Sequence, residues 1–223
     1  MENNIKYLIF DFGDVLGYPL MKNWFITPNF YKIIGTNIID MDKFNYLKIK
    51  YNFMVSGKID NEKEEFEYFV EFYKKVLEEM NISSNNEVIC KYAQEIAYDF
   101  VYNEDKIVLY SDTKQGLEKL SNKYKLILLS DNWPCVFKML KKWDIEKFFD
   151  KIYISSIYNC LKRDKVFFDF PINEYNIKEN EAVFIDDNIS LLEIAEEKGL
   201  VPILMDRSKS ITDCKYKIIN ELL

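Results

Sequence analysis

The sequence of 223 residues contains no histidine. This absence excludes Ser-His-Asp and Cys-His catalysis, and it excludes every zinc site that needs an imidazole ligand. Any reaction must therefore use carboxylates, lysine, serine, threonine, cysteine or tyrosine.

Cysteines are few and far apart, at Cys90, Cys135, Cys160 and Cys214. No two of them have the short spacing of a zinc site built from cysteine alone. We therefore expect reduced thiols in a cytoplasmic protein rather than disulfides. A catalytic cysteine is disfavoured because no histidine is present to activate it.

Long apolar runs are also absent, and no stretch reaches the roughly 18 apolar residues of a membrane span. The first residues, Met1 to Asn4, lack the basic start and apolar stretch of a signal peptide. We expect no membrane association and a cytoplasmic location.

Positive charge is in deficit, because 37 acidic residues exceed 30 basic ones and give a net charge of −7. Sequence-independent nucleic-acid binding depends on lysine and arginine neutralising phosphates, so nucleic acid is a poor candidate partner. Lysine pairs such as Lys141 and Lys142 are typical of solvated helix faces.

What the sequence does contain is an alternation of strand-like and helical patterns, interrupted once. Between residues 19 and 102 the strand-like runs disappear. Apolar residues there recur at helical spacing, most clearly over Asn61–Met80 and less so over Phe44–Val55 and Asn86–Phe100. Alternating strands and helices imply a parallel sheet. We predict an α/β fold, a Rossmann-like core of residues 1–18 and 103–223 with an all-helical cap of residues 19–102.

The predicted core elements can be given by their ranges. Strands are expected over Lys6–Phe10, Lys125–Leu129, Lys151–Ser155, Ala182–Ile185 and Val201–Leu204. Helices are expected over Thr113–Asn122 with Asp112 as cap, Pro134–Lys142, Lys165–Tyr175 bent or shortened by Pro171, Ile189–Lys198 and Ile211–Leu222.

Three apolar runs are each followed at once by a polar residue: IFDFGDVL at 9–16, LILLSDN at 126–132 and AVFIDDN at 182–188. Open α/β sheets bind ligands at the carboxyl ends of their strands. Together with Lys162, these strand ends predict a site for phosphate and metal. The adjacent carboxylates of Asp186 and Asp187 repel each other unless a cation lies beside them, and Mg²⁺ suits such oxygen ligands.

Each of these residues also has a simpler interpretation. Asp187 or Asn188 could cap a helix, Ser130 could form a turn, and Lys162 could be a solvated surface charge. The joint occurrence of all four motifs in one order favours the functional interpretation.

With these motifs, the chain resembles the hydrolases of the haloacid dehalogenase superfamily along essentially its whole length. Its FD-x-G-x-VL and FIDDN forms are similar to the sugar-phosphatase-like branch, which is related to glucose-1-phosphatases and the amino-terminal domains of epoxide hydrolases. The resemblance implies a Mg²⁺-dependent phosphatase that forms an aspartyl-phosphate and acts on a small phosphorylated metabolite.

The resemblance also implies roles for individual residues. Asp11 is the nucleophile, and Lys162 neutralises the phosphate. The metal is held by Asp11, the Gly13 carbonyl and Asp187, with Asp186 beside it. Ser130 and the backbone N–H groups after it, at Asp131 and Asn132, bind phosphate oxygens.

Three positions depart from the family pattern. Gly13 stands where most phosphatases of the superfamily carry a general acid, and Asp14 lies one residue further on. Arg163 and Leu191 replace a usual proline and a usual acidic residue. Since general acid catalysis is worth about 100- to 10,000-fold, we expect a slow enzyme.

Other functions stay open at this point. A catalytically weak binding protein fits the departures. Dehalogenation also uses an aspartate nucleophile but needs no metal, and phosphonate hydrolysis needs a reactive cap lysine, for which Lys22 and Lys58 are available.

Asp14, Tyr18, Trp24 and Trp133 lie near the motifs and are candidates for substrate contact, as is Phe25, although aromatic residues more often pack in cores.

Overall fold

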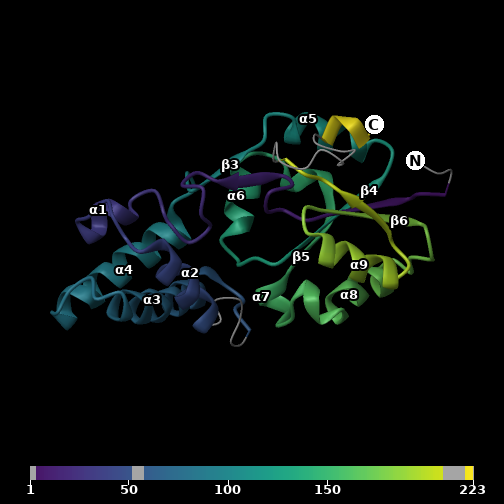
Figure 1. Cartoon of the computed structure of the whole chain (residues 1–223). Coiled ribbons are helices and arrows are strands. Elements are labelled where there is room, and N and C mark those ends of the chain that lie inside the picture. Colours follow the sequence, from purple (N-terminus) through teal and green to yellow (C-terminus); the bar gives the residue numbers. More distant parts are fainter. Residues whose placement is uncertain (1–3, 52–57, 208–218, 223) are drawn as a thin grey trace.

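The computed structural model describes residues 4–51, 58–207 and 219–222 of the chain. Its main sheet has five parallel strands in the order β5-β4-β1-β6-β7 (Figure 1). The strands are β1 (Tyr7–Phe10), β4 (Lys125–Ser130), β5 (Phe149–Ile154), β6 (Ala182–Asp186) and β7 (Val201–Leu204). The predicted parallel α/β core is confirmed.

Helices cover both faces of this sheet. Successive residues of a strand point to opposite faces, so each strand contributes side chains to a buried cluster on either side. In β1, Leu8 and Phe10 join one buried cluster and Ile9 joins another. The first cluster includes side chains of α5 (Thr113–Ser121) and α6 (Val136–Lys142), and the second includes side chains of α8 (Val166–Glu174) and α9 (Ile189–Glu197). Strands buried on both faces explain the nearly continuous apolar runs of the sequence.

A helical segment is inserted between β2 (Gly17–Pro19) and β3 (Ile107–Leu109), which pair in antiparallel fashion. Its helices are α1 (Phe30–Ile34), α2 (Met41–Lys50), α3 (Glu62–Glu79) and α4 (Asn86–Tyr102). They lie beside the sheet as a separate layer (Figure 1). The inserted helical cap is thus confirmed, while its division from the core at residues 19 and 102 stays a prediction.

The cap is held together by α3 and α4, which pack against each other. The Asn61 side chain accepts hydrogen bonds from the N–H groups of Lys63 and Glu64 and so caps α3, at the residue where the sequence predicts this helix to begin. Phe69 of α3 and Phe100 of α4 meet at a ring distance of 3.9 Å. This contact lies at the centre of a buried aromatic cluster that also contains Phe25, Phe72, Tyr73 and Trp133.

Several local predictions are corrected by the structure. Asp112 does not cap α5. Its carboxylate instead pairs with Arg207 at 2.7 Å and accepts the N–H of Ile219. Pro134 precedes α6 rather than opening it, since the helix begins at Val136 after a turn.

Pro171 lies inside α8 without ending it, because its carbonyl still accepts the Tyr175 N–H at 3.1 Å. Short elements were missed: α1, β2, β3, α7 (Ser155–Tyr158) and 3₁₀ turns at Glu146–Phe148 and Lys162–Asp164. The helix expected over Phe44–Val55 is α2, and residues 52–57 lie outside the described residues. Most of the helix expected over Ile211–Leu222 also lies outside them, and Ile219–Leu222 forms a 3₁₀ turn.

Two expected absences can be compared with the structure. Among the residues that it describes, no helix is long and apolar enough to cross a membrane. Cys90, Cys135 and Cys160 are free thiols, and Cys214 lies outside the described residues.

Candidate active site

Three predicted strand ends lie side by side at one edge of the sheet. β1 is flanked by β4 and β6, so Phe10 pairs with both Leu128 and Ile185. Asp11 follows β1 directly, and Ser130 and Asp186 are the last residues of β4 and β6. The sheet topology therefore brings Asp11 together with side chains that lie more than 100 residues further along the sequence.

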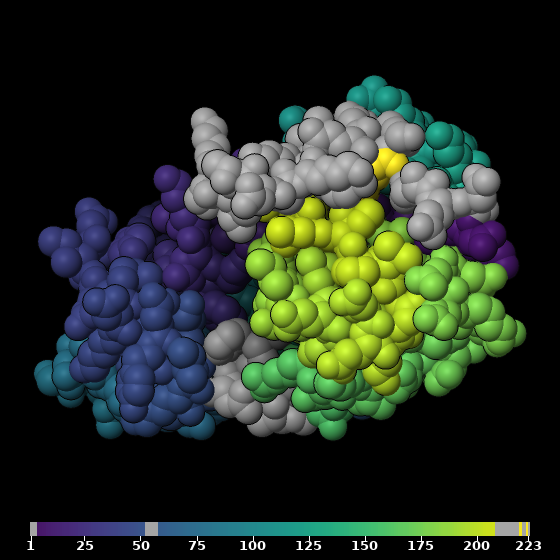
Figure 2. Space-filling view, turned by 45° about the vertical axis from the view of Figure 1, so that its right-hand side comes forward, coloured from purple at the N-terminus to yellow at the C-terminus, as the bar shows by residue number. Residues whose placement is uncertain are grey.

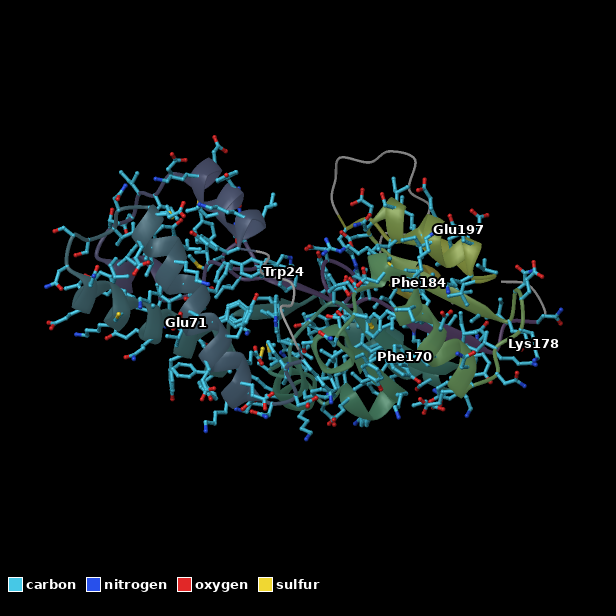
Figure 3. The ribbon with its side chains drawn as sticks, turned by 90° about the horizontal axis from the view of Figure 1, so that it is seen from below. Trp24, Glu71, Phe170, Lys178, Phe184 and Glu197 are labelled. Carbon is cyan, nitrogen blue, oxygen red and sulfur yellow. The ribbon has the colours of Figure 1, made fainter. Side chains whose placement is uncertain are left out.

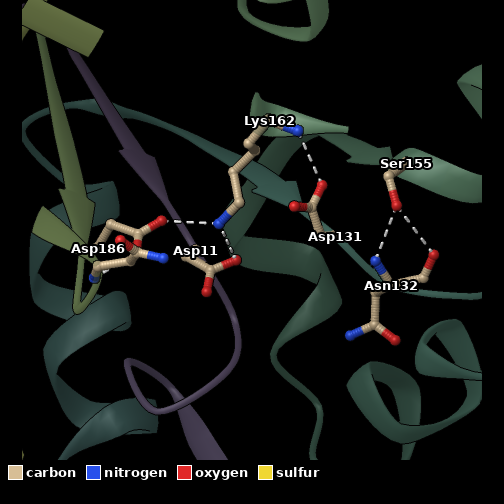
Figure 4. Close-up of polar contacts among 7 residues, drawn as sticks. Asp11, Asp131, Asn132, Ser155, Lys162 and Asp186 are labelled. Carbon is tan, nitrogen blue, oxygen red and sulfur yellow. Dashed lines mark hydrogen bonds and ion pairs between the residues drawn. The ribbon is translucent and has the colours of Figure 1, made fainter. Parts of the chain in front are cut away.

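Lys162 is a buried residue and not a solvated surface charge, since it is only 2% exposed. Its ammonium group lies 2.8 Å from Asp11 Oδ1 and 2.7 Å from Asp186 Oδ2 (Figure 4). Its main-chain N–H donates to Asp131 Oδ1 at 3.0 Å, which fixes the 3₁₀ turn that carries it. Asp186 and Asp131 thus orient Lys162. In the family pattern, an acidic residue at the position of Leu191 would have this role.

Asp11, Asp186 and Asp187 form an acidic cluster in which one carboxylate oxygen of each lies within 4.8 Å of the others. Asp186 is fully engaged, because its other oxygen accepts the Asn188 N–H at 2.8 Å. Asp187 has no hydrogen bond or ion pair to another described residue. Asn188, not Asp187, caps α9 by accepting the N–H of Ser190. The Asp187 carboxylate is therefore free to bind a cation.

The electrostatics of this cluster follow from burial and crowding. Burial raises the pKa of Asp11 to about 6, with Asp186 adding to the rise and Lys162 opposing it. Burial and the carboxylates of Asp11 and Asp186 raise the pKa of Asp187 to about 7. Burial lowers the pKa of Lys162, but the surrounding carboxylates more than reverse this and raise it. Lys162 therefore stays charged, while protons and a cation compete for the acidic oxygens.

The loop after β4 carries the predicted phosphate-binding residues. Ser130 is buried and lines the pocket that opens beside Asp11. The Asp131 carboxylate is used to hold Lys162, and the polar groups of Asn132 are used within the loop. Its N–H donates to Ser155 Oγ at 3.1 Å (Figure 4). Its side-chain oxygen accepts the Trp133 N–H at 2.9 Å.

Trp24 occupies the space beside Gly13. A Cβ atom on Gly13 would lie 3.2 Å from the Trp24 ring, closer than almost all real contacts of this kind. The indole N–H of Trp24 donates to Asp14 Oδ2 at 3.2 Å, and Asp14 has a left-handed backbone with a φ of 54°. Trp24 lies at the junction between the cap and the core (Figure 3). An acidic side chain at position 13 would thus have little room.

The remaining predicted substrate contacts, Tyr18 and Trp133, lie in different environments. Tyr18 on β2 is partly exposed, with its ring 4.9 Å from that of Tyr110, and it lines a smaller pocket beside Asp14 and Trp24. Trp133 is buried in the aromatic cluster and lines the main pocket.

The main pocket has a volume of about 480 Å³ and extends from the acidic cluster to the cap. Its lining residues come from both the cap and the core, which lie side by side in the space-filling view (Figure 2). Lys22 lines it, whereas Lys58 pairs with Asp60 at the surface. Lys48, Phe100 and Lys106 also line the pocket, and sequence reasoning missed them. No local signal marks these residues, because tertiary packing of the cap alone places them there.

A protein-family model described as haloacid dehalogenase-like hydrolase matches residues 35–204, well over half of the chain. The chain belongs to this family. The match begins after Asp11 and includes Ser130, Lys162 and the Asp186-Asp187 pair. No curated protein matches the chain with significant similarity.

Solved structures share the fold of this family member at low sequence identity. A 2-haloacid dehalogenase from Pseudomonas syringae pv. tomato is 12% identical, with a TM-score of 0.67 and coverage of 98% of this chain and 96% of that chain. A haloacid dehalogenase-family (HAD) phosphatase from Thermococcus onnurineus is 19% identical, with a TM-score of 0.60 and coverage of 98% and 96%. A HAD-family enzyme from Bacteroides thetaiotaomicron, solved with magnesium and inorganic phosphate, is 21% identical, with a TM-score of 0.59 and coverage of 93% and 98%.

Proposed function

We propose that this hydrolase is a Mg²⁺-dependent phosphatase that cleaves a small phosphomonoester through an aspartyl-phosphate on Asp11. The observation that carries the proposal is the convergence of Asp11, Asp186 and Asp187 within 4.8 Å, beside the buried ammonium group of Lys162. Three carboxylates against one lysine leave an excess of negative charge, which a divalent cation would neutralise.

Magnesium fits the donor atoms that the site offers. Asp11, Asp187 and the Gly13 carbonyl would hold the ion through hard oxygen ligands. Asp186 is engaged by Lys162 and Asn188 and would act beside the ion rather than on it. When bound, Mg²⁺ supplies positive charge that offsets repulsion between the carboxylates and the phosphate.

The reaction itself is assigned to residues of the chain. Asp11 Oδ1 is bonded to Lys162, so Oδ2 is the oxygen proposed to attack phosphorus. The bond from phosphorus to the ester oxygen breaks, and water then hydrolyses the aspartyl-phosphate to regenerate Asp11 and release phosphate. Lys162 and Ser130 would stabilise the negative charge on the phosphate oxygens during both steps. The backbone N–H of Asp131 would donate a further hydrogen bond to these oxygens.

Protonation of the leaving group is the weak step of this scheme. Gly13 offers no acid, Trp24 fills the adjacent space, and Asp14 is held by the Trp24 indole. We therefore expect slow turnover of alkyl phosphates and faster turnover of esters whose leaving group needs no proton.

Two of the structural relatives support this choice over dehalogenation. The Bacteroides enzyme was solved with magnesium and inorganic phosphate, and the Thermococcus protein is called a phosphatase. The Pseudomonas dehalogenase supports the alternative, but the acidic pair at Asp186 and Asp187 favours a metal-dependent reaction. Membership of the sugar-phosphatase branch and a cytoplasmic location stay predictions.

Hydrolysis of p-nitrophenyl phosphate tests the proposal, with and without Mg²⁺. The wild type should turn over only with the metal, and Asp11→Asn should abolish turnover. Asp150→Asn is the matched control, because it removes a carboxylate from a surface ion pair with Lys125. A protein with no Mg²⁺-dependent turnover of this ester or of sugar phosphates would instead be a binding protein, and unchanged turnover in Asp11→Asn would refute the assigned nucleophile.

A further inference from the structure

Charge is unevenly distributed around the main pocket. All of its acidic lining residues lie at the carboxyl ends of the sheet strands or in the loops that follow them: Asp11, Asp14, Asp131, Asp186 and Asp187. Among the described residues of the cap and of β3 with its preceding turn, the only charged side chains lining the pocket are Lys22, Lys48 and Lys106. The pocket therefore has acidic side chains at the strand ends, which suit a metal, and lysines on the side formed by the cap and the turn before β3.

Lys22 forms no ion pair with another described residue, but it is exposed to solvent. Lys48 is the half-buried lysine of these three that lacks a compensating group. It lies over the rings of Phe25 and Phe44, at 5.3 Å and 5.8 Å from their centroids, and forms no ion pair with another described residue. Burial lowers its pKa. Lys50, on the same helix, instead points to a surface partner, Glu79. A half-buried ammonium group with only aromatic neighbours is costly unless an anion binds it.

Lys106 differs because the protein already satisfies it. Its ammonium group donates to the Phe100 carbonyl and lies 3.1 Å from Cys135 Sγ, and the Glu65 carboxylate is close enough to interact electrostatically. Lys106 is thus held in place by the fold, and Lys48 is the available cation.

A second unpartnered polar group of the pocket lining belongs to Trp133. The indole Nε1 of Trp133 is buried and has no hydrogen-bond partner, although Trp133 lines the pocket. Trp133 and Lys48 both contact the ring of Phe25, which lies 5.9 Å from the ring of Trp133 and 5.3 Å from the Lys48 ammonium. Leaving a buried N–H without a hydrogen-bond partner costs about 1–3 kcal/mol of free energy. A hydrogen bond from this N–H to a ligand oxygen would recover that cost.

We propose that the substrate carries a carboxylate in addition to its phosphate, and that Lys48 binds this carboxylate at the cap end of the pocket with Trp133 as a second donor. This inference rests on the proposed function, because the phosphate is assigned to the acidic end. One ammonium group and one indole N–H match the two oxygens of a carboxylate and are too few for a second phosphate. A neutral sugar ring would leave the Lys48 charge without a partner.

The pocket is large enough for such a compound, because about 480 Å³ is within the usual range of small-molecule sites. Lys48 would be a specificity-determining residue. It selects the substrate through its distal group and takes no part in the chemistry at Asp11.

The test compares ω-carboxyalkyl phosphates with ω-hydroxyalkyl phosphates of the same chain length, in the presence of Mg²⁺. For the wild type, kcat/KM should favour the carboxylate. Lys48→Met should reduce this preference roughly 10- to 150-fold, which corresponds to loss of a hydrogen bond to a charged group. Lys48→Arg should retain most of the preference, and Lys50→Met is the control because it removes a lysine of the same helix that faces a surface partner.

Binding to the Asp11→Asn variant, measured by calorimetry with the same two compounds, gives a readout that does not need turnover. A carboxylate preference that disappears when Lys48→Met is added supports the inference even if catalysis is absent. If Lys48→Met keeps a preference for the carboxylate compound that is within twofold of the wild-type preference, both in kinetics and in binding, the inference is refuted. If p-nitrophenyl phosphate is hydrolysed in that case, the proposed function stands and only the substrate class is wrong. Lys48→Gln replaces Lys48→Met if the latter does not fold.

Discussion

Glu65 offers a quantitative test of how the cap and core are joined. This residue of α3 is fully buried, and its Oε2 accepts the main-chain N–H of Cys135, which directly precedes α6, at 2.8 Å. Its other oxygen, Oε1, has no partner. Burial raises the pKa of Glu65 from its ordinary value of 4.5 to about 7, with Lys106 and Cys135 opposing the rise.

The sign of the pH dependence follows from this shift. Between pH 4.5 and about 7, the folded protein keeps a proton on Glu65 that the unfolded chain has lost. Stability should therefore fall as pH rises through this window and level off above it. At about 1.4 kcal/mol for each pKa unit, the buried carboxylate lowers the free energy of unfolding by about 3 kcal/mol above pH 7.

Substitution of Glu65 by glutamine removes the titration and keeps an oxygen for the Cys135 N–H. We expect the stability of Glu65→Gln relative to the wild type to rise by about 3 kcal/mol between roughly pH 5 and pH 8, measured by urea unfolding. Glu67→Gln is the control, because Glu67 lies on the exposed side of the same helix. A stability difference that does not change with pH would show that Glu65 is not desolvated and would refute the reasoning.

Two other predictions concern the metal site and the core. The Mg²⁺ concentration needed for half-maximal thermal stabilisation should fall roughly tenfold between pH 6 and pH 8, because protons leave Asp187 and Asp11, with pKa values of about 7 and 6. Chelation or Asp187→Asn should abolish the effect, and a midpoint independent of pH would contradict the assigned ligands. Gly116→Ala should destabilise the protein by about 1–2 kcal/mol in denaturant unfolding despite its better helix propensity, because the new Cβ would lie 2.4 Å from Ile219 Cγ2. Gln115→Ala, at an exposed position of the same helix, should have little effect, and a stabilised Gly116→Ala variant would disprove the close packing.

The strand ends of the site were predictable because their signal is local. An apolar run followed by Asp11, or by Asp186 and Asp187, reports both the buried strand and the polar edge where it ends. Lys162 was included in the predicted site because of its order among the motifs, but no nearby pattern shows that it is buried. Its burial depends on a 3₁₀ turn anchored by Asp131, 31 residues earlier.

The cap side of the pocket was not predictable for a related reason. Lys48 has the same local sequence context as the exposed Lys50, and only the packing of α2 against Phe25 separates them. Trp24 was correctly placed near the motifs. Its contact with Gly13, however, depends on the path of a loop with no periodic pattern. Asp112 was wrongly predicted as a cap because Arg207, 95 residues away, competes for its carboxylate.

The packing of Trp24 over Gly13 constrains how this chain could evolve. A single base change converts any glycine codon into an aspartate or a glutamate codon, so an acid at position 13 is always within mutational reach. In the present protein that carboxylate would meet an indole ring where it needs room. A lineage that gains an acid here would have to move the Trp24 ring by a few tenths of an ångström or replace it with a smaller residue.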